Sequence, residues 1–120
     1  MFQIALNAAE FAPGSIVTGT ATFVAEKAVT PKRISLDLLW STRGRGDVSY
    51  AYLAEGNYEP GPVAAGETVR VPFEAALPEH APRSFAGELI ELYYCVRGRV
   101  DLPWAIDEKA EAEFAVVNAA

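Results

Sequence analysis

From position 77 the sequence reads Leu77-Pro78-Glu79-His80-Ala81-Pro82-Arg83-Ser84-Phe85-Ala86-Gly87. Pro78 and Pro82 fix their own φ angles and push the residues before them into the extended region, so a helix is not expected here. Apolar and polar residues then alternate as far as Val100-Asp101-Leu102-Pro103-Trp104. Alternation with a period of two is typical of a β-strand that has one buried face. This part of the sequence therefore predicts an all-β fold.

The same alternation recurs along the rest of the chain and predicts about seven strands. Their inward-facing residues are Phe2, Ile4 and Leu6; Val17, Gly19, Ala21 and Phe23; Ile34, Leu36, Leu38 and Trp40; Val48, Tyr50 and Tyr52; Val69, Val71, Phe73 and Ala75; Ile90, Leu92, Tyr94, Val96 and Val100; and Ala110, Ala112, Phe114 and Val116. Strands with one apolar and one polar face form antiparallel sheets that are covered on one side. Two such sheets bury their apolar faces against each other, which predicts a β-sandwich.

Length and composition narrow the class of protein. A chain of 120 residues fits one domain, residues 1–120, that buries a core without metal or disulfide support. Cys95 is the only cysteine, and the sequence shows no secretion signal and no apolar run long enough to span a bilayer. We therefore expect a cytoplasmic protein without membrane insertion. The net charge of -6, with scattered basic residues, argues against a nucleic-acid partner.

Candidate catalytic and metal-binding residues are few. His80 is the only imidazole and Cys95 the only thiol, and the predicted strand places the thiol roughly 25 Å from the strand start that follows His80. The two side chains are therefore not expected to form a catalytic pair. The acidic residues Asp107, Glu111 and Glu113 indicate a solvated strand face rather than a cation site. We expect no enzymatic activity, no metal and no cofactor.

Several short motifs occur in a characteristic order. They are Phe11-x-Pro13-Gly14-x-x-Val17-x-Gly19, then Gly66 before a strand that ends Phe73-x-x-x-Leu77-Pro78, then Pro82-x-Ser84-Phe85-x-Gly87, and finally Tyr94-x-Val96. Together they resemble the N-terminal domain of the arrestin family, which includes arrestin-domain-containing proteins, arrestin-like retromer subunits and compact sporulation-control proteins. The resemblance covers nearly the whole chain. It implies an immunoglobulin-like sandwich, no enzymatic activity, and a role as an adaptor or scaffold that binds other proteins.

Two routes to a partner are expected. At a sheet edge, free N–H and C=O groups accept an additional strand. On the outer face of a sheet, Leu39, Leu89 and Tyr93 point away from the core by the alternation that buries their neighbours, and they would form an apolar patch. Either surface would bind a protein partner or a second copy in a homodimer.

A small-ligand or carbohydrate-binding sandwich is the alternative function. Tyr50, Tyr52 and Tyr58 would then supply a stacking surface, although core and cross-strand packing is the simpler explanation for these tyrosines. Trp40 and Trp104 are expected to anchor the core and its rim, because a tryptophan buries a large apolar area. For Trp104, which follows Leu102-Pro103 at a strand exit, a partly exposed binding role is the less favoured alternative.

Overall fold

The computed structural model describes residues 1–44, 50–86 and 90–117. The strands of these segments are β1 (Phe2–Leu6), β2 (Glu10–Phe11), β3 (Ile16–Val24), β4 (Arg33–Gly44), β5 (Tyr50–Tyr58), β6 (Thr68–Ala76), β7 (Phe85–Ala86), β8 (Ile90–Asp101) and β9 (Glu108–Val116). All the predicted strands are present, although Val48, predicted to begin one of them, lies outside the described residues, and the two-residue strands β2 and β7 are additional. Within the described residues, no helix is long and apolar enough to cross a membrane.

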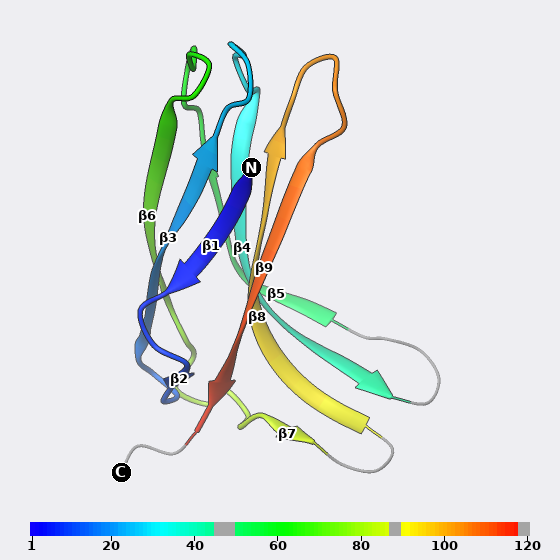
Figure 1. Cartoon of the computed structure of the whole chain (residues 1–120). Coiled ribbons are helices and arrows are strands. Elements are labelled where there is room, and N and C mark those ends of the chain that lie inside the picture. Colours follow the sequence, from blue (N-terminus) through cyan, green and yellow to red (C-terminus); the bar gives the residue numbers. More distant parts are fainter. Residues whose placement is uncertain (45–49, 87–89, 118–120) are drawn as a thin grey trace.

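The strands form two sheets that face each other (Figure 1). The smaller sheet has the order β1-β3-β6, and the larger has the order β2-β9-β8-β4-β5, with β7 beside β8. Every pairing is antiparallel except that of β2 with β9, which is parallel. The predicted all-β sandwich is therefore confirmed, with one short parallel pair that the alternation did not predict.

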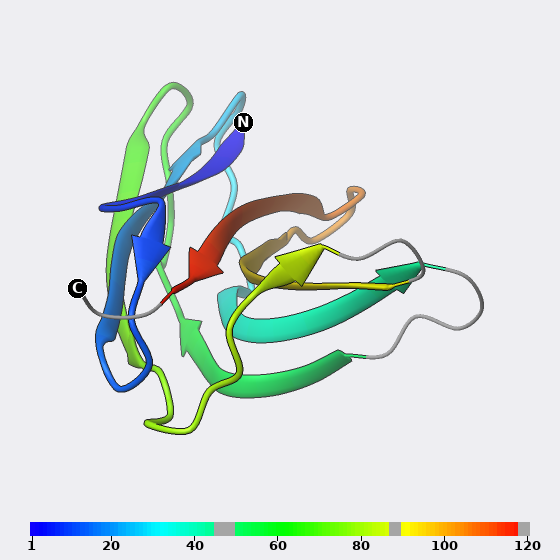
Figure 2. The same ribbon diagram turned by 90° about the horizontal axis from the view of Figure 1, so that it is seen from below.

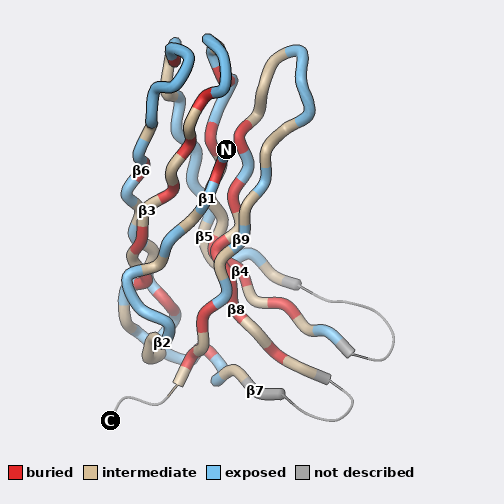
Figure 3. Tube along the Cα trace, viewed as in Figure 1, coloured by how far each residue is buried: buried red, intermediate tan, exposed pale blue. Residues whose placement is uncertain are grey.

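The core lies between the sheets, where buried residues follow the facing sides of the strands (Figure 3). Leu92, Tyr94 and Phe114 are buried in one cluster, and Phe73 packs against them. The rings of Tyr94 and Phe114 have centroids 5.7 Å apart. The register predicted for β8 and β9 is thus confirmed.

Gly19 allows two strands and an aromatic ring to approach closely. A Cβ atom at this position would lie 2.5 Å from the backbone oxygen of Ala5 and 2.8 Å from the ring of Phe73. No side chain fits in such a space, so this inward position on β3 requires glycine.

The larger sheet bends sharply near its middle. The lower halves of β4, β5 and β8 turn away from the smaller sheet in Figure 1, and Figure 2 shows the curvature from below. A β-bulge lies at the bend, where the register between β4 and β5 shifts between Leu38 and Leu39. Bulges bend the strand that contains them and increase its twist. The outer face of the larger sheet therefore lies on the inside of the bend.

The segment from Leu77 to Ser84 fills the space that the bend opens between the sheets. Leu77 and Ala81 are buried in the same cluster as Tyr94. The prediction that the segment is extended throughout is wrong, because Ala81 N–H donates to Pro78 O at 3.1 Å and closes a turn at Glu79 and His80. Ser84 closes the segment onto β9: its backbone N–H donates to Val116 O at 3.0 Å, and its hydroxyl oxygen accepts from Val116 N at 2.9 Å. The segment is thereby fastened to the larger sheet.

Candidate functional site

Residues with catalytic potential are not brought together. His80 is exposed in the loop between β6 and β7, whereas Cys95 is completely buried in the middle of β8. Burial, and secondarily the charge of Glu111, raises the pKa of the Cys95 thiol to about 12, so the thiol stays protonated and unreactive at neutral pH. In the described part of the chain, no group of three or more His, Cys, Asp and Glu residues is arranged to hold a metal ion.

The exposure predicted for Leu39 is wrong. Leu39 is 0% exposed although it lies on the outer face, where it pairs with Cys95 of β8 and Tyr52 of β5. The prediction assumed that every side chain on the outer face of a sheet contacts solvent, which holds only for a flat sheet. In this bent sheet the outer face is concave, and neighbouring side chains close over the middle of it.

Tyr93 is half-buried on the same face, beneath an arginine. The guanidinium carbon of Arg43 lies 3.9 Å from the centroid of the Tyr93 ring, a cation–π contact. Arg43 Nη2 also lies 2.7 Å from a Glu91 carboxylate oxygen and 2.9 Å from a Glu113 oxygen. The hydrogen bond from Arg43 lowers the pKa of Glu91. Tyr93 is thus covered by a cation that two carboxylates hold in place.

The apolar patch predicted for the outer face is not formed by the described residues. Leu39 is inaccessible, Tyr93 is partly covered, and Leu89 lies outside the described residues. Binding of a partner through Tyr93 or Leu89 stays a prediction.

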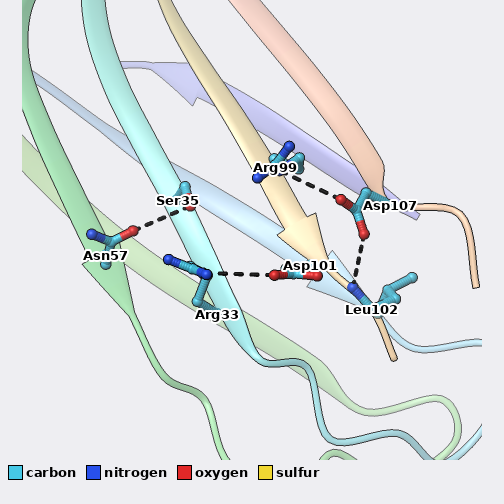
Figure 4. A network of polar contacts seen from close by, with 7 residues as sticks. All are labelled: Arg33, Ser35, Asn57, Arg99, Asp101, Leu102 and Asp107. Atoms are coloured by element: carbon cyan, nitrogen blue, oxygen red, sulfur yellow. Dashed lines mark hydrogen bonds and ion pairs between the residues drawn. The ribbon is translucent and has the colours of Figure 1, made fainter. Parts of the chain in front are cut away.

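The remainder of the outer face carries paired charges. Arg97 lies 3.1 Å from Glu111, and further along the sheet Arg99 lies 3.5 Å from Asp107 and Arg33 lies 3.6 Å from Asp101 (Figure 4). Asp37 is half-buried among these strands, and burial, together with the charge of Glu55, raises the pKa of its carboxyl group. Because both signs alternate over this face, it has no strong preference for a partner of one charge.

The two sides of the sandwich differ. On one side β1 lies close to β9, whereas on the other β5 and β6 leave a groove of about 290 Å³ between the sheets. The apolar residues that line this groove include Leu36, Ala54, Val71, Phe73 and Val96. The groove therefore gives access to the apolar interior along one side of the sandwich.

The two strands that border this groove are both sheet edges, but they differ in composition. In β6, Pro72 lies at the centre of the strand between the charged residues Arg70 and Glu74. Proline and charge are the usual protection of an edge against an incoming strand. In β5, which runs from Tyr50 to Tyr58, there is no proline and Glu55 is the one charged residue. On the side of β5 opposite to β4, no strand among the described residues pairs with it.

Tyr52 and Tyr58, the two of these tyrosines whose side chains the structure describes, do not form one stacking surface. Tyr58 pairs with the buried Ile34 and lines the groove between the sheets, whereas Tyr52 pairs with Leu39 on the outer face. The prediction that Tyr52 lines the core is wrong, because the side chain is 46% exposed. The side chain of Tyr50 lies outside the described part of the structure. No described pair of these residues supports the carbohydrate-binding alternative.

Comparison with known proteins gives a family and a fold. The model of the arrestin (or S-antigen) N-terminal domain matches residues 60–120. The crystal structure of Spo0M, a sporulation control protein from Bacillus subtilis, has a TM-score of 0.77 and 21% sequence identity, and the match covers 99% of this chain. It covers 49% of the Spo0M chain, so this sequence spans about half the length of that protein. No curated protein sequence matches this chain.

Proposed function

This chain belongs to the family of the arrestin N-terminal domain, and from that premise we propose that it is a protein-interaction module of the cytoplasm, an adaptor or scaffold without catalytic activity. Members of this family are generally non-enzymatic. The separation of the exposed His80 from the buried Cys95 supports the proposal, because in the described part of the chain the imidazole and the thiol are not brought together for nucleophilic chemistry. We treat residues 1–120 as one interaction unit.

The observation that carries the proposal is the free edge of β5 beside an apolar groove. An extended segment of another protein placed along β5 would pair with the N–H and C=O groups that face away from β4. Because side chains of a strand alternate, every second residue of that segment would enter the groove that Val71, Phe73 and Val96 line. Backbone pairing would supply affinity, and the groove would supply specificity.

The charges around the groove indicate the chemistry of the bound segment. Asp37, Glu55 and Glu74 are among the residues that line it, and the described lining contains no Lys, Arg or His. A segment in which apolar residues alternate with Lys or Arg would therefore be favoured, since its cations would lie near these carboxylates. An acidic segment would be disfavoured by repulsion.

Synthetic peptides test this proposal. We expect a peptide of alternating valine and lysine to bind more tightly than one of alternating valine and glutamate, measured by fluorescence anisotropy at physiological salt. Successive backbone N–H groups of β5 point alternately to β4 and to the open edge. Of the two variants Glu55→Pro and Gly56→Pro, one therefore removes an N–H group at the open edge and leaves the hydrogen bonds with β4 intact, and the other breaks a hydrogen bond with β4. The variant that keeps the wild-type melting temperature should lose binding.

Alanine at the same position is the matched control: it keeps the backbone N–H group and should bind more tightly than proline, although Glu55→Ala also loses the attraction of one carboxylate. Glu55→Ala removes one carboxylate and keeps the backbone N–H group, and Gly56→Ala adds a Cβ whose nearest neighbour would be Leu36 O at 3.6 Å, an ordinary contact. Equal binding of the two peptides, or full binding by the folded proline variant, would contradict the proposal.

A further inference from the structure

The end of the sandwich away from the bend carries an unusual apolar projection. The loop between β8 and β9, the orange segment in Figure 1, exposes Trp104 (103%) and Ile106 (92%) almost completely. The prediction that Trp104 anchors the rim of the core is therefore wrong, because the loop extends beyond the sheets. Single exposed apolar residues are common, but two large ones at the tip of one loop form a protruding contact point.

The loop is held in this conformation by specific contacts. Trp104 has a φ angle of 63°, which is uncommon for a bulky residue and is seen where the surrounding structure imposes it. The Asp107 carboxylate accepts a hydrogen bond from the Leu102 backbone N–H at 3.1 Å and lies 3.5 Å from Arg99 (Figure 4). Asp107 thus closes the base of the loop, and Trp104 is presented from a defined turn.

A hollow lies beside this loop on the same end of the molecule. It has a volume of about 880 Å³, and its floor consists of the buried residues Phe23, Ala25 and Val63. Two reciprocal backbone hydrogen bonds of 2.9 and 2.8 Å join Val29 to Val63 and fix the two loops that form one wall. An apolar projection and an apolar hollow are therefore adjacent on one surface.

We propose that this end of the sandwich is the interface of a homodimer in which Trp104 of each copy enters the hollow of the other. A twofold axis through this end would bring each projection to the opposite hollow, as an isologous interface requires. Charges of both signs line the hollow, namely Glu26, Lys27 and Glu108. Glu108 is paired with the N-terminal ammonium of its own chain at 2.9 Å, so in a symmetric pair Lys27 of one copy would meet Glu26 of the other, and the interface would be self-complementary in charge as well as in shape.

The expected interface is small. Each tryptophan buries on the order of 150–250 Å², and two such contacts with Ile106 and the loop rims approach the lower range of specific interfaces, about 1,200 Å² in total. We therefore expect a reversible dimer whose population depends on protein concentration. This interface uses neither β5 nor the groove beside it, so it is independent of the peptide-binding proposal.

Analytical ultracentrifugation over a wide concentration range tests the proposal. The wild type should shift from monomer to dimer as concentration rises. Trp104→Asn should stay monomeric, because asparagine tolerates the positive φ and keeps the turn while removing the projection. Tyr52→Ala removes an exposed aromatic residue at the bend, where it pairs with Leu39, and should dimerise as the wild type does. Wild-type protein that is monomeric throughout, or a Trp104→Asn variant that still dimerises, would overturn the proposal.

Mixing two variants locates the contact. Val29→Asp places a carboxylate in the hollow and should also abolish dimerisation, with its fold checked by circular dichroism. Trp104 also lines the hollow of its own copy, so Trp104→Asn removes part of one wall but keeps the floor and Val29. A mixture of Trp104→Asn and Val29→Asp can therefore still form a heterodimer in which Trp104 of the Val29→Asp copy enters the hollow of the other. Recovery of heterodimer in the mixture, at weaker affinity than the wild-type dimer, is expected; its absence would contradict the exchange of Trp104. Binding of the wild type, but not of Trp104→Asn, to phosphatidylcholine vesicles, without any dimer, would assign the loop to a lipid surface instead.

Discussion

The hydroxyl group of Tyr94 donates a hydrogen bond to the backbone carbonyl oxygen of Pro82. It joins a fully buried side chain of β8 to the proline-containing segment that indicates the fold in the sequence. Burial raises the pKa of the Tyr94 hydroxyl, so the group stays protonated and can donate across the physiological range. The bond thus holds the segment beneath the bent half of the larger sheet.

Removal of this hydroxyl should destabilise the protein modestly. Tyr94→Phe leaves the ring in contact with Phe114 but deletes the donor to Pro82, and we expect a loss of about 1 kcal/mol in the free energy of unfolding. Urea denaturation of the variant beside the wild type measures this change. A loss as large as that of a core truncation would mean that the ring packing is disturbed as well.

Truncation in the core should cost more. Leu92→Ala leaves a cavity next to Tyr94 and Phe114, and we expect about 2 to 5 kcal/mol of destabilisation. The neighbouring Glu91→Ala removes only a solvent-exposed ion pair with Arg43 and should leave the free energy of unfolding nearly unchanged. Similar unfolding midpoints for the two variants would contradict the register of β8.

Ionisation of Asp37 should oppose folding. Because its pKa is raised in the folded state, chiefly by burial, the folded protein binds this proton more tightly than the unfolded chain. Stability from this group is therefore greatest at acidic pH and decreases as pH rises through the unfolded-state and then the folded-state pKa. Asp37→Asn should raise the melting temperature at pH 7 and have a smaller effect near about pH 3. Glu67→Gln, at an exposed loop position, is the control and should leave the melting temperature unchanged.

The Cys95 thiol should be inert in the folded protein. It is completely buried and its pKa is raised to about 12, so a disulfide reagent at pH 8 should react only as fast as the protein unfolds. Full labelling in denaturant provides the control. His80→Ala and a conservative Cys95→Ser variant that folds should both retain peptide binding, and loss of binding in folded His80→Ala would contradict a purely structural role for this loop residue.

The sequence predicted the strands well because alternation directly reports which face of a strand is buried. It placed Leu92, Tyr94 and Phe114 in the core, but it missed the hydrogen-bonded turn between Pro78 and Ala81. Leu39 was misplaced because alternation assumes a flat sheet, and the bend that buries this residue depends on pairing between strands distant in sequence. Trp104 was misplaced because apolar character alone does not distinguish a core residue from a loop tip. The strands β2 and β7 are too short to show a period.

The edges of the sheets were only partly predictable. Pro72 marks β6 as an edge strand, since proline cannot donate to a neighbour in the middle of a sheet. The order of strands that leaves one side of β5 without a partner among the described residues follows from long-range pairing, which periodicity does not reveal. Had that order been known, the lack of proline in β5 would have identified it as the open edge.

Amide hydrogen exchange with and without the valine–lysine peptide is the most direct test of the proposed binding mode. If the peptide adds to the sheet, alternate amides between Tyr50 and Tyr58 gain protection when it binds, because those that face away from β4 acquire partners. Amides of β6 next to Pro72 should change little by comparison. Binding that leaves β5 unprotected, or that protects the outer face around Tyr93 instead, would contradict the assignment of β5 as the site that receives a partner strand.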